Sequence, residues 1–160
     1  MSGTIGKETN DNMQKYENYK EQFKRLKKAF YYKFYMEAIF IKYAIMEDRI
    51  ESILKYEGNE IKPKNDKEFI SITRKLNKIA LISRDKKSVS NRYFADDTVN
   101  VILDWIKRRN SLIHALLKKE LTADEVETFA LEGKTIARTI CNKANNYKRA
   151  VERRKGKNEH

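Results

Sequence analysis

The chain of 160 residues contains one cysteine, one proline and five glycines. The single cysteine, Cys141, cannot form a disulfide within the chain, and its isolation favours a reducing compartment. Because proline and glycine interrupt helices, their scarcity in a chain with 36% charged residues is typical of a helical protein. We therefore expect an all-α fold.

Long apolar runs are missing as well. The longest tract, residues 39–46, is interrupted by Lys42 and followed by Glu47, so it is not expected to span a membrane. No apolar stretch near the N-terminus is typical of a signal peptide. These absences predict a soluble, cytoplasmic protein with no membrane partner.

Acidic residues are too few to balance the basic ones. The chain has 35 lysines and arginines against 23 aspartates and glutamates, a net charge of +12. This excess favours an anionic partner, and a nucleic acid is the foremost candidate because lysine and arginine neutralise phosphates. The alternative is that the lysines serve only solubility.

Two apolar stripes at helical spacing cover residues 16–30 and 32–53. The second stripe keeps an unbroken four-three spacing in a new register, and Gly58 ends it. The sequence leaves open whether 11–57 forms one helix or two, but the change of register favours a break at 27–32.

Five aromatic residues lie at this change of register: Phe30, Tyr31, Tyr32, Phe34 and Tyr35. Exposed aromatic rings can stack on nucleic-acid bases. Because these rings share a helical stripe, we favour packing in the core and at a dimer interface.

A loop around Pro63 separates these stripes from the rest of the chain. Asp66 is a candidate N-cap for a third helix, which is expected to end near Ser83. The polar, basic segment 84–95 that follows is expected to be a mobile loop.

The last two helices carry clear start signals. Asp96 or Asp97 is expected to cap a helix that ends near Lys119. Thr122 and Glu125 then form a capping box at the start of a final amphipathic helix.

These patterns predict one helical domain, residues 11–152, built as an antiparallel bundle of four to five helices. Residues 1–10 are rich in small polar side chains without periodicity and are expected to be disordered. Residues 153–160 are expected to form a basic tail.

The helix before the capping box carries the most informative stretch, residues 107–114. On a helix, Arg109 falls within an apolar face, Asn110 lies at its edge, and His114 follows just over one turn later. A buried guanidinium cannot lose its proton, so Arg109 must pair with an acid, open onto a cleft or face a partner chain. The apolar neighbours of Arg109 on this face are Ile102, Trp105, Leu112, Ile113 and Leu116.

Glu47 and Asp48 are the acids that we consider as partners of Arg109. The alternative is that both are solvated surface charges.

The residues favour neither a metal site nor a cofactor. One internal histidine and one cysteine, on different expected helices, have no zinc-ligand spacing, and no acidic cluster is typical of a two-metal site. Gly133-Lys134-Thr135 ends like a phosphate-binding loop, but Thr128 stands where the first glycine would be. Metal-free acid–base chemistry remains.

Metal-free cleavage of RNA needs a base for the 2′-hydroxyl, a proton donor for the leaving oxygen and a cation on the phosphate. Arg109 can bind phosphate with two parallel hydrogen bonds, and His114 can transfer protons. One histidine is too few for both proton transfers, so the hypothesis includes a symmetric homodimer.

The spacing Arg109-Asn110-x-x-x-His114 resembles the Arg-x(4–6)-His signature of the HEPN (higher eukaryotes and prokaryotes nucleotide-binding) superfamily, whose RNase members often carry Arg-Asn. The resemblance implies a HEPN-like helical bundle, a dimer with a composite active site, and metal-independent endoribonuclease activity on RNA. It implies that Arg109 stabilises the phosphate, that Asn110 orients the phosphate or the histidine, and that His114 transfers protons.

Many members of this superfamily are toxins or act in phage defence. The resemblance therefore also implies a role in growth arrest or defence, with an antitoxin or another defence protein as partner. Leu116 stands where one toxin group has a tyrosine, which argues against a nucleotide-modifying antitoxin.

Basic residues near the motif and in the segment 84–95 are candidates for contacts with nucleic-acid phosphates. They are Lys107, Arg108, Lys118, Lys86, Lys87 and Arg92.

Two other functions stay open. Thr122 to Glu125 with Gly133 faintly resembles a DNA-binding helix-turn-helix, although the spacing after Gly133 is too short for it. The chain can also be a non-catalytic interaction protein. In that case Arg109 would form a structural ion pair and His114 a hydrogen bond at an interface.

Overall fold

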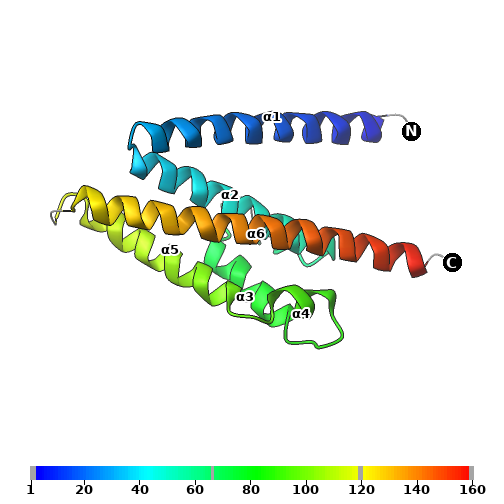
Figure 1. Ribbon diagram of the computed structural model, residues 1–160. Helices are drawn as coiled ribbons and strands as arrows, with labels where there is room; N and C mark the ends of the chain where they lie inside the picture. The colour runs from blue at the N-terminus through cyan, green and yellow to red at the C-terminus, as the bar shows by residue number, and fades with distance from the viewer. Residues whose placement is uncertain (1–2, 66, 119–120, 159–160) are drawn as a thin grey trace.

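The computed structural model describes residues 3–65, 67–118 and 121–158. These residues form α-helices and no strand, so the all-α prediction is confirmed for the described part of the chain (Figure 1). The helices are α1 (Gly3–Tyr31), α2 (Tyr35–Tyr56), α3 (Ile72–Ile82), α4 (Val89–Phe94), α5 (Thr98–Ala115) and α6 (Ala123–Asn158).

Helices α2 and α6 form the centre of the bundle, and they run parallel to each other (Figure 1). Near the start of both helices, Lys42 and Lys134 line one hollow. At the end of both, Lys155 donates a hydrogen bond to the backbone oxygen of Tyr56 at 3.2 Å.

The predicted antiparallel bundle of four to five helices therefore needs two corrections. The central pair is parallel, because a short connection forces an antiparallel arrangement only on helices that follow each other in the chain. The described residues also contain a short additional helix, α4.

The core lies around this central pair. Trp105 of α5 is fully buried and stacks on Phe129 of α6, with ring centroids 4.9 Å apart. Burying side chains of this size contributes about 1.5–3 kcal/mol each. The last helix is amphipathic, as predicted, and its apolar stripe is buried apart from the partly buried Val126: Phe129, Ile136, Ile140, Ala144, Tyr147 and Val151.

Two left-handed residues end the first two helices. Gly58, with φ of 70°, follows α2, and its successor Asn59 donates its N–H to the oxygen of Leu54, as predicted for a glycine-terminated helix. Lys33, with φ of 59°, is left-handed in the same way after α1, and its successor Phe34 donates its N–H to the oxygen of Ala29. The predicted break between the two stripes is thus confirmed, within a few residues of its expected place.

The aromatic residues at this break are mostly exposed, contrary to the predicted core packing. Tyr31, Tyr32 and Phe34 are 80%, 59% and 59% exposed. They lie at the tip of the tight α1–α2 turn, where no other described helix covers them. Only Tyr35 is buried, and Phe30 is partly buried.

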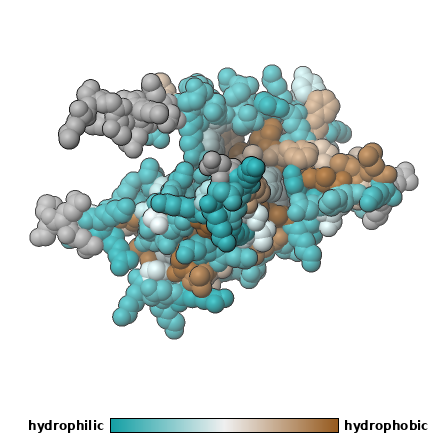
Figure 2. Space-filling model, turned by 180° about the vertical axis from the view of Figure 1, so that it is seen from behind, coloured by the Kyte–Doolittle hydropathy of each residue, from teal (hydrophilic) through white to brown (hydrophobic). Residues whose placement is uncertain are grey.

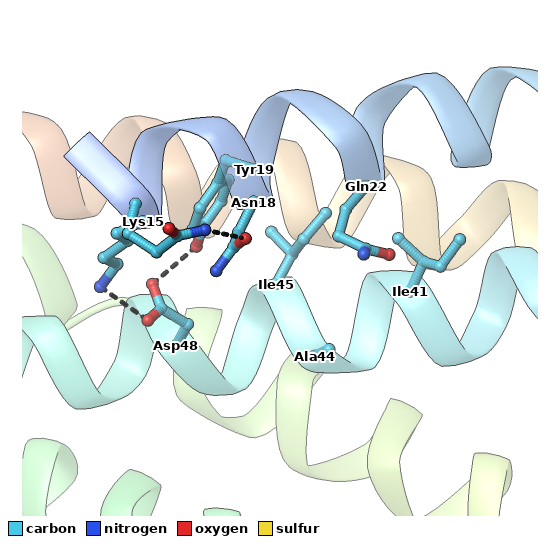
Figure 3. Close-up of a pocket in the computed structure, with 9 residues that line it drawn as sticks. Lys15, Asn18, Tyr19, Gln22, Ile41, Ala44, Ile45 and Asp48 are labelled. Atoms are coloured by element: carbon cyan, nitrogen blue, oxygen red, sulfur yellow. Dashed lines mark hydrogen bonds and ion pairs between the residues drawn. The ribbon is translucent and has the colours of Figure 1, made fainter. Parts of the chain in front are cut away.

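Asp48 of α2 holds α1 against the bundle (Figure 3). It forms an ion pair with Lys15 at 2.7 Å and accepts a hydrogen bond from the Tyr19 hydroxyl at 2.6 Å. Arg49 also contacts it at 2.6 Å. Burial alone would raise the pKa of Asp48, but the three donors outweigh it and lower that pKa below its ordinary value.

The ends of α1 and α6 extend further than expected. Helix α1 begins at Gly3, inside the segment 1–10 that we expected to be disordered. Helix α6 continues to Asn158 through most of the expected basic tail, 153–160. Adding one residue to an existing helix forms one hydrogen bond at little cost, so a helix can extend beyond the end of its apolar stripe.

The segment 84–95 is not a simple loop, because it contains α4. Ser88 caps this helix by accepting the N–H of Asn91 at 3.0 Å, and the Asn91 side chain donates to the oxygen of Ser83 at 2.7 Å. Ser90 is fully buried and hydrogen-bonds to Tyr147 of α6 at 3.0 Å. These hydrogen bonds attach the segment to the bundle, so the prediction of a mobile loop over 84–95 is corrected.

The helix boundaries near the expected caps also differ in detail. Ser71 caps α3, whereas the expected cap Asp66 lies outside the described residues. Asp97 occupies the cap position of α5 but caps no backbone N–H, since its carboxylate accepts a hydrogen bond from the Asn100 side chain at 3.0 Å. Asp96 accepts the N–H of Thr98 at 3.1 Å. The capping box of Thr122 is confirmed.

Helix α5 ends at Ala115, before the expected Lys119, which is not described. No described helix is both long enough and apolar enough to cross a membrane.

We expect replacement of Gly133 by alanine to destabilise the protein. A Cβ at this position would lie 2.6 Å from Cζ2 of Trp105, whose ring is stacked and fully buried. The clash should lower the free energy of unfolding by about 1–3 kcal/mol, although alanine is the better helix former. Urea denaturation followed by circular dichroism measures this change.

Gly156→Ala is the matched control on the same helix, because nothing lies within 4 Å of its added Cβ. It should leave stability unchanged or raise it by up to about 1 kcal/mol. Equal stabilities of the Gly133→Ala protein and the wild type would show that Trp105 does not restrict position 133.

We expect acid to release α1. Because the pKa of Asp48 is lower in the folded protein than its ordinary value of about 3.9, its stabilising effect is complete above that pH and is lost as pH falls through the folded value. The protection factors of α1 amides, which compare the measured exchange rate with the intrinsic rate at the same pH, should therefore fall below about pH 4. Asp48→Asn should show the low protection already at neutral pH; unchanged protection in this variant would contradict the role of Asp48.

Candidate functional site

The guanidinium of Arg109 lies between two aromatic rings of α2. Its Cζ is 4.4 Å from the centroid of the Tyr43 ring and 5.1 Å from that of Phe40. Cation–π contacts at these distances hold the charge and the plane of the guanidinium in place. Arg109 is therefore half-buried at the contact between α5 and α2, as the apolar face around it predicted.

Most of the hydrogen-bond donors of Arg109 are unused. One terminal nitrogen donates to Oδ1 of Asn110 at 3.0 Å. The Nε atom is buried and has no acceptor in the structure. Within residues 3–65, 67–118 and 121–158, Arg109 forms no ion pair, so the structural ion pair that the sequence left open is not found there.

Glu47 and Asp48 do not bind Arg109. Glu47 accepts a hydrogen bond from Lys75 of α3 at 3.3 Å. Asp48 binds Lys15 and Tyr19 of α1 and its neighbour Arg49. Successive residues on a helix point about 100° apart, so these neighbours serve different helices. The expectation that one of these carboxylates pairs with Arg109 is corrected.

Arg108, the residue before the motif, is fully engaged. It donates to Asp104 at 2.7 Å and to the two carboxylate oxygens of Glu132 on α6, one of them at 2.9 Å. Its hydrogen bonds with Glu132 raise its already high pKa. Arg108 thus joins α5 to α6, which argues against its predicted role as a phosphate contact.

Asn110 lies between Arg109 and His114 along α5, and the structure shows its contact with Arg109. Asn110 and His114 are four residues apart on α5, so their side chains are neighbours on one face of the helix. Both side chains are exposed, and His114 lies in the last turn of the helix. A guanidinium, an amide and an imidazole therefore follow one another along the surface.

The other predicted phosphate contacts form two groups. Lys107 and Lys118 are exposed near the end of α5 that carries His114. Lys86, Lys87 and Arg92 are exposed around α4, at the opposite end of α5 (Figure 1). Because α5 has 18 residues and is about 27 Å long, only the first group lies near the motif.

Exposed apolar side chains gather beside the motif, at the end of the bundle where α1 meets α2 and α5 approaches α6. Figure 2 shows them as the brown region on the right. Leu117 is 99% exposed, and Phe34, Phe40 and Leu116 are 59%, 46% and 44% exposed. Contiguous exposed apolar surface of this kind is typical of a protein–protein interface.

Phe40 and Tyr43 were not among the residues that the sequence predicted for the site. They share a helical face, since they are three residues apart, but the spacing does not tell which helix that face meets. Their role follows only from the packing of α2 against α5.

Comparisons of the chain with protein-family models, with curated proteins and with solved structures gave no match. The resemblance to the HEPN superfamily therefore rests on the motif of α5 and stays a prediction.

Proposed function

We propose that this protein is a metal-independent endoribonuclease with Arg109, Asn110 and His114 as its catalytic residues. The observation that carries the proposal is the state of Arg109. Its guanidinium lies over two aromatic rings and has unused donors, and an exposed histidine follows five residues later on the same helix. Arg108, by contrast, is held by carboxylates.

Such a guanidinium suits a phosphodiester. The rings of Phe40 and Tyr43 hold the plane of the Arg109 side chain without neutralising its charge. Its terminal nitrogens can then donate to two oxygens of one phosphate, and this bidentate contact strengthens as negative charge develops in the transition state.

Histidine side chains titrate near neutral pH and serve the proton steps. In the proposed reaction, His114 of one chain takes the proton of the 2′-hydroxyl, whose oxygen attacks the adjacent phosphorus. The bond from phosphorus to the 5′-oxygen breaks, and that oxygen receives a proton from His114 of the second chain. The products are a 2′,3′-cyclic phosphate and a free 5′-hydroxyl.

A symmetric homodimer would supply both histidines. Two observations support dimerisation through this end of the bundle. Phe40 both contacts Arg109 and is 46% exposed, and Leu116 and Leu117 directly follow the last turn of α5. An isologous interface over these residues would bring two motifs together.

The biological setting of the proposal comes from the resemblance. We propose a role in growth arrest or phage defence, in which an antitoxin or another protein of the defence system controls the activity.

The second candidate is a nucleic-acid-binding protein without catalysis. The net charge of +12 favours it as much as it favours the nuclease. The two functions differ in what they require of His114: a binding protein does not need its imidazole.

The test is incubation of mixed RNA with the protein in EDTA. We expect cleavage by the wild type, with cyclic phosphate at the new 3′-ends. His114→Ala should reduce the rate by about 10²–10⁴-fold, because it removes the proton-transfer group. Arg109→Lys should also abolish cleavage while the fold is kept, since an ammonium lacks the guanidinium's two parallel donors.

His160→Ala and Arg74→Lys are the matched controls, since neither residue is among the proposed catalytic residues. Both should cleave like the wild type. A folded, dimeric wild type that cleaves no RNA would favour the binding protein, and cleavage retained by His114→Ala would exclude the proposed mechanism.

A further inference from the structure

Helix α1 packs along α2 (Figure 1). A groove between α1 and α6 is lined by residues of both helices. Two adjoining hollows of about 780 Å³ and 500 Å³ form this groove, and they share Phe23 and Lys27 of α1. In the second hollow, Lys42 of α2 lines the groove between α1 and α6. Lys134 and Arg138 line it from α6. We call these five residues the α1–α6 groove.

The groove is strongly basic. Among the lining residues whose side chains the structure describes, nine are lysines or arginines and none is a carboxylate. Five of the nine form ion pairs with carboxylates outside the lining. The other four, Lys27, Lys42, Lys134 and Arg138, form no ion pair in the part of the chain that the structure describes, and all four line the second hollow.

Lys42 is the most informative of these cations. It is only 7% exposed, and among the described residues it has no hydrogen-bond acceptor or ion-pair partner. Its ammonium lies 5.9 Å from the centroid of the Phe23 ring. Burial lowers the pKa of Lys42, and the nearby Lys134 lowers it further. Its Nζ is not one of the fully buried, unpartnered polar atoms of the described residues. The ammonium therefore reaches the hollow, where an anion would compensate its partial desolvation.

Aromatic rings stand beside these cations. Phe23 lines both hollows and is 43% exposed, and Tyr16 lines the first hollow and is 65% exposed. Tyr16, Tyr19 and Phe23 follow the spacing of one helical face of α1, so their rings face the groove as a row. Lys134 lies over the ring of Phe30, 5.5 Å from its centroid.

We propose that the α1–α6 groove binds single-stranded nucleic acid, with a phosphate beside Lys42 and a base stacked on Phe23. Unpaired cations alone would suit any polyanion, but exposed rings between them match the alternation of base and phosphate in a single strand. The groove is lined by a different side of α2 from the one that contacts Arg109, so binding there does not depend on the proposed cleavage.

The test is fluorescence anisotropy of labelled single-stranded oligonucleotides of about 12 nucleotides, which suits a groove of this kind. DNA is titrated with the wild type. RNA of the same sequence is titrated with the His114→Ala chain, so that cleavage does not alter the probe. Titrations at several salt concentrations report how many phosphates are contacted.

We expect Lys134→Gln with Arg138→Gln to weaken binding and to reduce the salt slope by about 1.4, which is two lost phosphate contacts at about 0.7 each. Phe23→Ala should weaken binding about tenfold with little change in the salt slope. Lys42→Met should weaken binding without loss of thermal stability, because an apolar side chain of similar shape replaces an unpaired buried charge.

The matched control is Arg149→Gln with Arg153→Gln, which removes two exposed charges from α6 outside the groove. Binding that falls equally in both double variants would overturn the proposal, since only net charge would then matter. The nucleic-acid assignment would also be overturned if polyglutamate or vesicles of anionic lipid competed with the oligonucleotide at equal charge. A preference of the groove for RNA over DNA would identify RNA as its natural strand.

Discussion

Helix α2 has to pack against four helices at once, α1, α3, α5 and α6, and the rest of the structure depends on how its faces are divided. Buried isoleucines and Met46 of α2 belong to the core that it forms with α6. Phe40 and Tyr43 meet Arg109 of α5, and Asp48 binds α1. Lys42 is the charged residue of α2 that has no carboxylate partner among the described residues, and it lines the groove between α1 and α6. Both proposed sites are thus set by the same helix.

The partners of the buried cations distinguish the structural cations of this chain from those that we propose to be functional. Arg108 and Lys75 are bound by carboxylates and join helices to each other. Arg109 and Lys42 are at least half-buried and lack a carboxylate partner in the described part of the molecule. A buried cation is normally neutralised by a nearby carboxylate. Because Arg109 and Lys42 have none in that part of the chain, they are good candidates for binding an external anion.

Features with a local cause could be predicted from the sequence. Gly58 ends α2 because glycine adopts the left-handed conformation freely, and the capping box of Thr122 starts α6. Features that depend on partners distant in the chain could not. Lys33 gives no sign that it will adopt a positive φ, and no local pattern makes α2 parallel to α6. The same holds for the site: the spacing pointed to Arg109, but its aromatic partners on α2 follow only from the packed structure.

The most direct test of a site shared between two chains is the activity of mixed dimers. Wild-type and His114→Ala chains are mixed in equal amounts and allowed to exchange partners. The rate of RNA cleavage by the mixture is compared with that of wild type alone at the same total chain concentration. If each cleft needs both histidines, only dimers of two wild-type chains are active, and about a quarter of the activity remains. Activity of about one half would mean that each chain acts alone, and would contradict the composite site.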